Sequence, residues 1–171
     1  LRTPAMRGRT GEFALTEILY DAGFEVTDTS MGTAKDEGYM DLLIHPKGVP
    51  SLRIAVECKN REKIDPNKDV ALFEERAREG IARGMFESGI FVSLRATTKK
   101  EGGVHHIHML NDANGHPVVP VSYLGTERGR DAQPLTRDVV QAHVCMHASM
   151  MFRLMELSRS IQSKETETSD T

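Results

Sequence analysis

The sequence has little of what marks a secreted or membrane protein. Only two cysteines occur, Cys58 and Cys145, and Cys58 stands in the candidate site described below, where a disulfide would compete with function. We therefore expect a reducing intracellular compartment, either the cytoplasm or the nucleus or nucleoid. No apolar run approaches the roughly 18 residues of a membrane span, and no signal-peptide pattern opens the chain. The first residue is Leu1 rather than methionine, which favours a processed chain or a domain of a larger chain or complex.

An excess of charge of one sign is also missing. The 22 Lys and Arg residues are nearly balanced by 25 Asp and Glu residues, which gives a formal net charge of −3. Because proteins that bind nucleic acid usually carry a basic surface, composition alone does not indicate such a partner. Any basic surface must be local, and the candidate is the N-terminus, where Arg2, Arg7 and Arg9 stand with no acidic residue before Glu12.

What the chain does contain is enough apolar sequence for one ordinary domain. Its 171 residues are 39% hydrophobic, which suffices to bury a single core and requires no second one. We expect a basic arm over residues 1–9, one domain over 10–161 and a disordered polar tail over 162–171. The domain is expected to comprise a core at about 10–95, a hairpin at 104–123 and a C-terminal helix at 136–161.

The pattern of apolar residues predicts an α/β fold. Helical spacing occupies residues 10–22 and 68–83, and a glycine follows each of these segments at once. The turn at 46–50 contains proline and glycine, so the apolar runs on either side of it are expected to form an antiparallel hairpin. Apolar runs predict strands at 24–26, 39–44, 52–59 and 89–94, before the strands of the second hairpin.

A charged triplet stands where the second and third expected strands meet. Asp41 lies within the run at 39–44, and Glu57 and Lys59 end the run that begins at Leu52. Residues two apart on a strand point to the same face, so the heads of Glu57 and Lys59 should converge, and the hairpin should bring Asp41 beside them. Two carboxylates can hold a hard divalent cation, and a lysine can stabilise what the cation activates as an ammonium group or deprotonate it as a neutral amine.

The order helix, three strands, helix, strand, together with Asp41 and the Glu57-x-Lys59 motif, resembles the PD-(D/E)xK nuclease superfamily. The nearest forms are the Mrr-type restriction endonucleases and the Holliday-junction resolvases, and the resemblance covers about residues 8–95. It implies a restriction-endonuclease-like αβββαβ core with a mixed sheet, to which the C-terminal β-hairpin and long helix are added. Met40 stands where the name-giving proline would be, a position that varies among relatives. The implied function is that of a metal-dependent DNA endonuclease, which hydrolyses phosphodiester bonds.

The resemblance also implies a role for each candidate residue. Asp41 and Glu57 would bind Mg²⁺ or Mn²⁺, with the backbone carbonyl of Cys58 as a third oxygen ligand. Lys59 would orient or deprotonate the attacking water, and Glu12 in the first helix would add a further carboxylate. Phosphate contacts are expected from basic and polar residues that flank these acids in the sequence, namely Arg7, Arg9, Lys35, Asn60 and Arg61.

Two other functions remain open on the sequence. A nuclease-like module that has lost catalysis could scaffold a larger nucleic-acid-processing assembly. Alternatively, the hairpin histidines could bind zinc in an interaction domain. His143 and His147 are four apart on the C-terminal helix, but the HExxH pattern of metalloproteases is missing. Ordinary hydrogen bonding is the simpler interpretation of both histidine groups. The hairpin histidines are His106 and His108, which share a strand face, with His105 and His116 nearby.

The C-terminal helix carries more large apolar side chains than one side of a small sheet would cover. These include Met150, Phe152, Met155 and Leu157. Core packing is the default explanation, and a homodimer joined through this helix is the alternative. A domain with one metal site would cut one strand, so cutting both strands of a duplex would need two copies.

Overall fold

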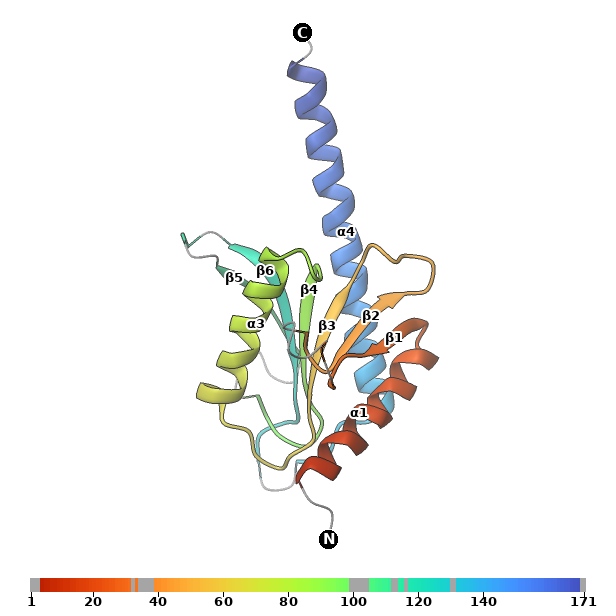
Figure 1. The fold of residues 1–171 in the computed structure, drawn as a ribbon, viewed down its shortest axis with the longest axis vertical. Coiled ribbons are helices and arrows are strands. Elements are labelled where there is room, and N and C mark those ends of the chain that lie inside the picture. The colour runs from red at the N-terminus through yellow and green to blue at the C-terminus, as the bar shows by residue number, and fades with distance from the viewer. Residues whose placement is uncertain are drawn as a thin grey trace.

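In a computed structural model of the chain, the described residues form one mixed sheet with helices on both faces (Figure 1). The structure describes residues 4–31, 33, 39–98, 105–111, 114–115, 117–129 and 132–169. The helices in this part of the chain are α1 (Pro4–Asp21), α3 (Ala71–Ala82) and α4 (Arg137–Ser169), with a π-helical turn, η1 (Pro66–Val70), directly before α3. The strands are β1 (Phe24–Asp28), β2 (Leu42–Pro46), β3 (Ile54–Lys59), β4 (Ser88–Ser93), β5 (His105–Asn111) and β6 (Pro117–Leu124).

The strands follow the spatial order β1-β2-β3-β4-β6-β5. Antiparallel pairs join β1 to β2, β2 to β3 and β5 to β6. In the centre, β3, β4 and β6 run parallel to one another, so the carboxyl ends of three strands meet at one edge of the sheet. The sequence predicted an α/β fold with a mixed sheet and two hairpins. These predictions are confirmed, and the hairpins are β2–β3 and β5–β6.

Each face of the sheet packs against its own helices. α1 and α4 cover one face, where Leu19, Val144 and Val56 belong to one core cluster. α3 covers the other face, where Phe73 packs in a second cluster that includes Ala55. Because side chains alternate along a strand, the residues of β3 are divided between these two clusters, and Glu57 and Lys59 continue the side of Ala55.

The first and last helices are longer than the sequence predicted. α1 begins at Pro4 rather than at residue 10, so residues 4–9 of the expected basic arm are helical. Proline is well tolerated in the first turn of a helix, because its missing N–H would be unpaired there in any case. α4 continues to Ser169, so the expected disordered tail is helical over 162–169. That segment contains no glycine or proline that would end the helix.

α4 has two parts with different surroundings. Up to Met151 the helix packs on the sheet through buried side chains such as Val140 and Ala148. Over 152–169 it projects away from the body of the molecule (Figure 1), and no side chain of that described segment is buried. Despite this length, neither α4 nor another helix in the described part of the chain is apolar enough to cross a membrane.

Candidate active site

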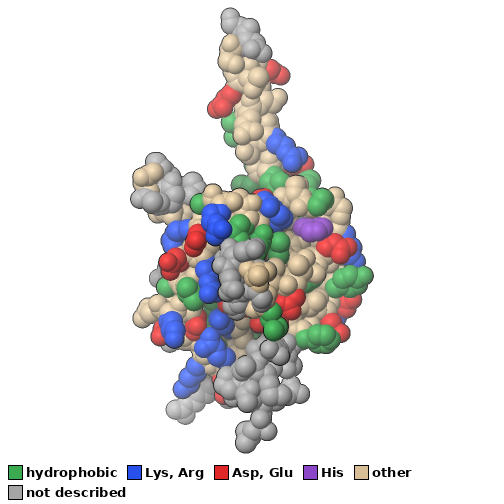
Figure 2. Space-filling model, viewed as in Figure 1, with side chains coloured by type: hydrophobic (Ala, Val, Ile, Leu, Met, Phe, Trp, Pro, Cys, Tyr) green, Lys and Arg blue, Asp and Glu red, His purple; other side chains and the backbone are tan. Residues whose placement is uncertain are grey.

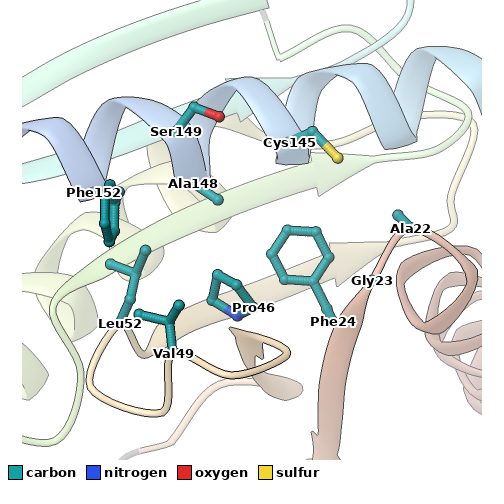
Figure 3. Close-up of a pocket in the computed structure, with 10 residues that line it drawn as sticks. All are labelled: Ala22, Gly23, Phe24, Pro46, Val49, Leu52, Cys145, Ala148, Ser149 and Phe152. Carbon is teal, nitrogen blue, oxygen red and sulfur yellow. The ribbon is translucent and has the colours of Figure 1, made fainter.

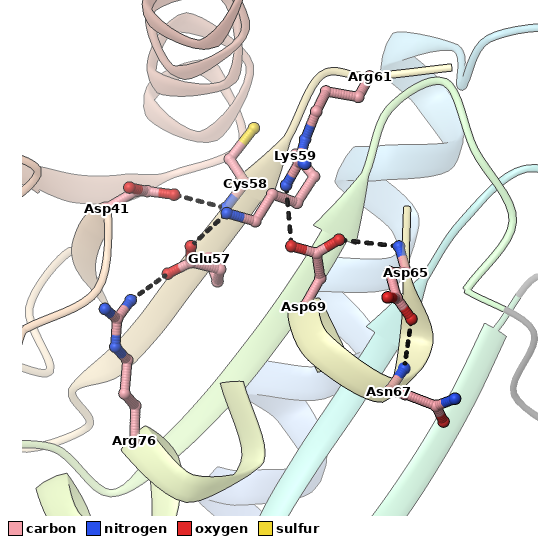
Figure 4. Close-up of polar contacts among 9 residues, drawn as sticks. All are labelled: Asp41, Glu57, Cys58, Lys59, Arg61, Asp65, Asn67, Asp69 and Arg76. Carbon is pink, nitrogen blue, oxygen red and sulfur yellow. Dashed lines mark hydrogen bonds and ion pairs between the residues drawn. The ribbon is translucent and has the colours of Figure 1, made fainter. Parts of the chain in front are cut away.

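The acidic and basic heads of the candidate site lie at the carboxyl end of β3 (Figure 4). Glu57 and Lys59 point to the same face, and the Lys59 Nζ lies 3.1 Å from the Glu57 Oε1. The Glu57 side chain is 5% exposed and that of Lys59 is 24% exposed, so the pair is largely withdrawn from water while the ammonium group keeps access to it. The prediction that strand alternation makes these two heads converge is confirmed.

Asp41 joins this pair from the neighbouring strand. It directly precedes β2, whose antiparallel register with β3 places Asp41 level with Glu57. The Asp41 side chain is buried, and its Oδ2 accepts a hydrogen bond of 2.9 Å from the Cys58 N–H. This bond fixes the carboxylate against the backbone of β3 between Glu57 and Lys59.

The surroundings of Glu57 disfavour its negative charge. Burial raises the pKa of the carboxyl group and the nearby Asp41 carboxylate raises it further, while Lys59 and Arg76 act in the opposite direction without cancelling the rise. The Glu57 Oε2 is buried and accepts no hydrogen bond from any described residue, which is costly for a carboxylate away from water. A bound cation would relieve both the repulsion between the two acids and the unsatisfied oxygen.

The ligands available at this site fit a cation that takes most of its ligands from water and substrate. Within the described ranges, no group of three or more His, Cys, Asp or Glu side chains is placed to hold a metal ion. Asp41 and Glu57 would supply two carboxylates, and Cys58 a main-chain carbonyl. Mg²⁺ is commonly bound by one or two carboxylates, with waters and a substrate phosphate completing its shell. The donors therefore suit Mg²⁺ or Mn²⁺ better than a structural zinc ion, which takes four protein ligands.

Arg76 on α3 belongs to this cluster, and sequence reasoning missed it. Its Nη1 lies 3.8 Å from the Glu57 Oε2, and Figure 4 shows the guanidinium reaching the carboxylate from the side opposite to Lys59. The Arg76 side chain is 31% exposed, so it can also meet an approaching anion. A signal was present in the sequence, because α3 faces the sheet through Phe73 and Ala77, and Arg76 stands one turn after the first of them.

The first helix approaches the site through Gly11. A Cβ atom at this position would lie 2.7 Å from the Asn60 Cβ, closer than two such atoms can pack, so glycine lets α1 lie against the residue that follows β3. The next residue, Glu12, is half-buried. Burial, followed by the charges of Asp41 and Glu12, raises the pKa of the Cys58 thiol. The Glu12 carboxylate therefore lies close enough to the end of β3 to act on it electrostatically.

The residues expected to contact phosphate are placed only in part. Arg61 is exposed, but its Nη2 donates to the Asp69 Oδ1 at 2.9 Å, so a phosphate would have to compete with that carboxylate. Burial acts to raise the pKa of Asp69, yet a backbone hydrogen bond and Arg61 hold it below its ordinary value. Lys35 lies outside the described residues, as do the side chains of Arg7 and Arg9, whose backbones belong to α1.

A polar hollow adjoins the carboxyl ends of the parallel strands. It measures about 310 Å³ and is lined by residues that follow β3, β4 and β6, among them Glu62, Arg95 and Thr126. Arg95 pairs with Glu62 at 2.9 Å. Ligands of α/β sheets commonly bind beyond the carboxyl ends of parallel strands. Figure 2 shows Lys and Arg side chains interspersed with acidic ones on the face it presents, so phosphate contacts would have to be local.

His143 and His147 form a closed hydrogen-bonded cluster beneath α4 rather than a metal site. The His147 Nε2 lies 2.8 Å from the Ser88 Oγ, and its Nδ1 lies 2.7 Å from the Ser122 Oγ. The His143 Nε2 lies 2.9 Å from the same Ser122 oxygen. All four side chains are fully buried. Burial, followed by the charge of His143, lowers the pKa of His147 to about 3, so this imidazole is neutral at physiological pH.

Most of the hairpin histidines lie outside the described residues. This holds for His116 and for the side chains of His105 and His106, whereas His108 on β5 is described and exposed. The grouping of the hairpin imidazoles around zinc stays a prediction.

A second hollow lies on the α4 side of the sheet (Figure 3). It measures about 370 Å³ and is lined mainly by apolar residues such as Phe24, Leu52 and Phe152, and Cys145 on α4 also belongs to its lining. No acidic or basic side chain belongs to its described lining, so it offers no group for metal or acid–base chemistry. Of these two hollows in the described part of the chain, the one beside the end of β3 therefore has the charged groups that such chemistry needs.

The chain matches no protein-family model, and no curated protein matches it. Function must therefore be inferred from the residues of the site.

Proposed function

We propose that the chain is a metal-dependent DNA endonuclease with a restriction-endonuclease-like core of the PD-(D/E)xK type. The observation that carries the proposal is the convergence of Asp41, Glu57 and Lys59 at the end of a central strand. Within it, one buried Glu57 oxygen accepts no hydrogen bond from the described residues. The element order supports the same conclusion, because α1, β1, β2, β3, α3 and β4 follow the αβββαβ order that the resemblance implies.

The chemistry follows from the types of side chain. Asp41 and Glu57 would hold Mg²⁺ or Mn²⁺ together with the Cys58 carbonyl. When bound, such a cation polarises a phosphate oxygen and lowers the pKa of a coordinated water. As a neutral amine, Lys59 would accept a proton from that water; as an ammonium group, it would orient the water and stabilise the negative charge that develops on the phosphate in the transition state. Lys59 contacts Glu57 at present, and it becomes free to face the substrate once that carboxylate is engaged.

Binding of the DNA backbone would use residues around this end of the sheet. Arg76 would balance the second Glu57 oxygen and, being partly exposed, could reach a phosphate. Asn60 and Arg61 follow β3 directly, and Arg95 in the polar hollow would extend the contact surface along the same edge. Glu12 would act as a further carboxylate from α1. A homodimer joined through α4 would carry two such sites, one in each copy.

A second candidate function is favoured by one observation. Glu57 is already paired with two cationic side chains, Lys59 and Arg76, and such a cluster can serve a purely structural purpose. The chain would then be a catalytically silent module that scaffolds a larger nucleic-acid-processing assembly. The two functions differ in metal binding, because the enzyme must bind Mg²⁺ or Mn²⁺ at this site and the silent module need not. Calorimetric titration of the purified chain with each ion measures that difference.

The direct test is cleavage of linear and branched DNA in Mg²⁺ and in Mn²⁺ by the wild type and by Asp41→Asn. Asparagine keeps an oxygen that can accept the Cys58 N–H but removes the negative charge. The fold is therefore expected to survive while cleavage falls by at least about 100-fold. Glu79→Gln is the matched control, because Glu79 is an exposed carboxyl on α3 that pairs with Arg83. A wild type that neither cleaves any substrate nor binds either ion would exclude the endonuclease.

A further inference from the structure

The projecting part of α4 carries an apolar stripe that no described residue covers. Leu154, Leu157 and Ile161 are 40%, 49% and 58% exposed. Their spacing of three and four residues is that of one helix face. Earlier in α4 the same face packs on the sheet. His147 stands seven residues, about two turns, before Leu154, so it lies on this face, and it is buried. The stripe thus continues beyond Met151, where the sheet beneath it ends (Figure 1).

Packing would add stability to the projecting segment. The segment 152–169 extends about 27 Å at 1.5 Å per residue. Most helical stability in proteins comes from packing of an apolar face, and this segment leaves such a face exposed. In the described structure Phe152 and Met155 at the base of the segment still contact the body, whereas every side chain over 156–169 is exposed, on the part of the helix that projects in Figures 1 and 2. Its exposed stripe therefore indicates a partner helix.

The charges along the segment indicate which partner fits. The half over 152–160 has a net charge of +1 and the half over 161–169 has a net charge of −1. Two copies that cross antiparallel place the basic half of each beside the acidic half of the other, whereas in a parallel pair like halves meet. The segment is thus complementary to a second copy of itself. The charged residues are Arg153, Glu156 and Arg159 in the first half and Lys164, Glu165 and Glu167 in the second.

We propose that two copies of this chain pair antiparallel through residues 152–169 of α4. In the register that joins the two stripes, Leu157 packs opposite the partner's Ile161, and the partner's Glu167 lies about 3 Å along the axis from the level of Arg153, within reach of its long side chain. The tip of each helix then reaches the level of residue 149 of the other copy, so the pairing uses the whole projection. The two bodies lie at opposite ends of the helix pair. This pairing does not depend on the proposed cleavage chemistry.

The native cysteines permit a direct measurement on the unaltered chain. Cys145 is exposed and Cys58 is buried, so a thiol-reactive spin label attaches at Cys145 alone. Antiparallel pairing places the two Cys145 residues about 40 Å apart along the helix axis, because each stands well before the crossing point near residue 159. Parallel pairing would leave them roughly 10 Å apart, the ordinary separation of packed helices. Pulsed electron paramagnetic resonance distinguishes these values, and the shorter distance would overturn the proposal.

Variants of the stripe test which residues hold the pair. Light scattering should give twice the chain mass of 19.0 kDa for the wild type at micromolar concentration. Leu157→Glu with Ile161→Glu should give monomers with an unchanged circular dichroism signal from the body, because both side chains are exposed in one copy. Ser163→Glu with Thr166→Glu adds the same charge away from the stripe and should stay dimeric. A monomeric wild type, or a control that dissociates like the stripe variant, would refute the pairing.

A charge exchange tests the antiparallel direction independently. Arg153→Glu alone should weaken the dimer, because it faces the partner's Glu167 with a like charge. Arg153→Glu combined with Glu167→Arg should restore the affinity. Within one copy, Arg153 contacts Glu156 at 3.2 Å, and both variants turn this attraction into a repulsion, so it does not account for a difference between them. Failure of the double variant to dimerise better than the single variant would count against the antiparallel register.

Discussion

Two buried polar clusters lie on opposite faces of the sheet, and they differ in how completely their groups are satisfied. The histidine–serine cluster is neutral, and its hydroxyl and imidazole groups are hydrogen-bonded to one another. The carboxylate cluster is charged, and one of its buried oxygens accepts no hydrogen bond from the described residues. The first consists of Ser88, Ser122, His143 and His147, and the second of Asp41, Glu57, Lys59 and Arg76.

The difference separates a structural role from a chemical one. A fully satisfied polar network makes a core rigid and specific, whereas a partly satisfied one costs stability. Such a cost is tolerated where a site needs its charges for function. The carboxylate cluster also keeps access to solvent through Lys59 and Arg76, while the histidine–serine cluster is closed beneath α4. Each of the following predictions changes one cluster and measures stability and function separately.

The largest effect is expected from Lys59→Ala. The ammonium group acts on the transition state rather than on the cation, so cleavage should fall by about 10²–10⁴-fold while Mg²⁺ and DNA binding stay nearly unchanged. Single-turnover cleavage and calorimetry measure the two quantities. Lys68→Ala, in the exposed turn η1, is the control. A Lys59→Ala protein that cuts at the wild-type rate would remove Lys59 from the mechanism.

His147→Ala should have the opposite profile. It removes a fully buried side chain and leaves the hydroxyls of Ser88 and Ser122 without that partner. The free energy of unfolding should therefore fall by about 2–4 kcal/mol in denaturant titrations, while the affinity for Mg²⁺ is unchanged. The exposed His108 supplies the control variant, His108→Ala, with little expected effect. A loss of metal affinity without a loss of stability would reverse the roles assigned to the clusters.

Acid should weaken the protein through the histidine–serine cluster. The pKa of His147 is about 3 in the folded chain against an ordinary 6.5, so the unfolded chain binds the proton first as the pH falls. Stability is thus full above about pH 6.5 and declines down to about pH 3, with a slope of up to about 1.4 kcal/mol per pH unit from this group. Unfolding curves across this pH range for the wild type and His147→Gln measure the contribution of His147 to the free energy of unfolding. Parallel profiles for the two proteins would contradict it.

The smallest effect is expected from Glu57→Gln. The raised pKa of Glu57 means that its ionised form is disfavoured by folding, so its contribution to stability falls as the pH rises above its ordinary 4.5. Replacing it with a neutral amide should therefore raise the free energy of unfolding at neutral pH by about 1 kcal/mol. The same variant should lose the increase in melting temperature that Mg²⁺ gives the wild type. A destabilised variant that still responds to Mg²⁺ would show that the cluster is structural.

Local rules predicted much of this architecture. The alternation of side chains along β3 made the convergence of Glu57 and Lys59 predictable, because the geometry of a strand depends only on neighbouring residues. The apolar runs and their turns likewise indicated the two hairpins and the α/β order. Helix ends were harder to predict, because α1 begins at Pro4 although Gly8 is a poor helix former, and α4 extends to Ser169 through polar residues that do not mark its end.

The amino-acid sequence by itself determined which residue types stand on which strand and which faces of its helices are apolar. Only the tertiary structure decided which of these meet across distance. Arg76 reaches Glu57 because α3 packs on the sheet, and His143 and His147 are closed off because α4 brings them over Ser88 and Ser122. Such contacts depend on how helices pack on a sheet, and residue spacing within a single element carries no information about that packing.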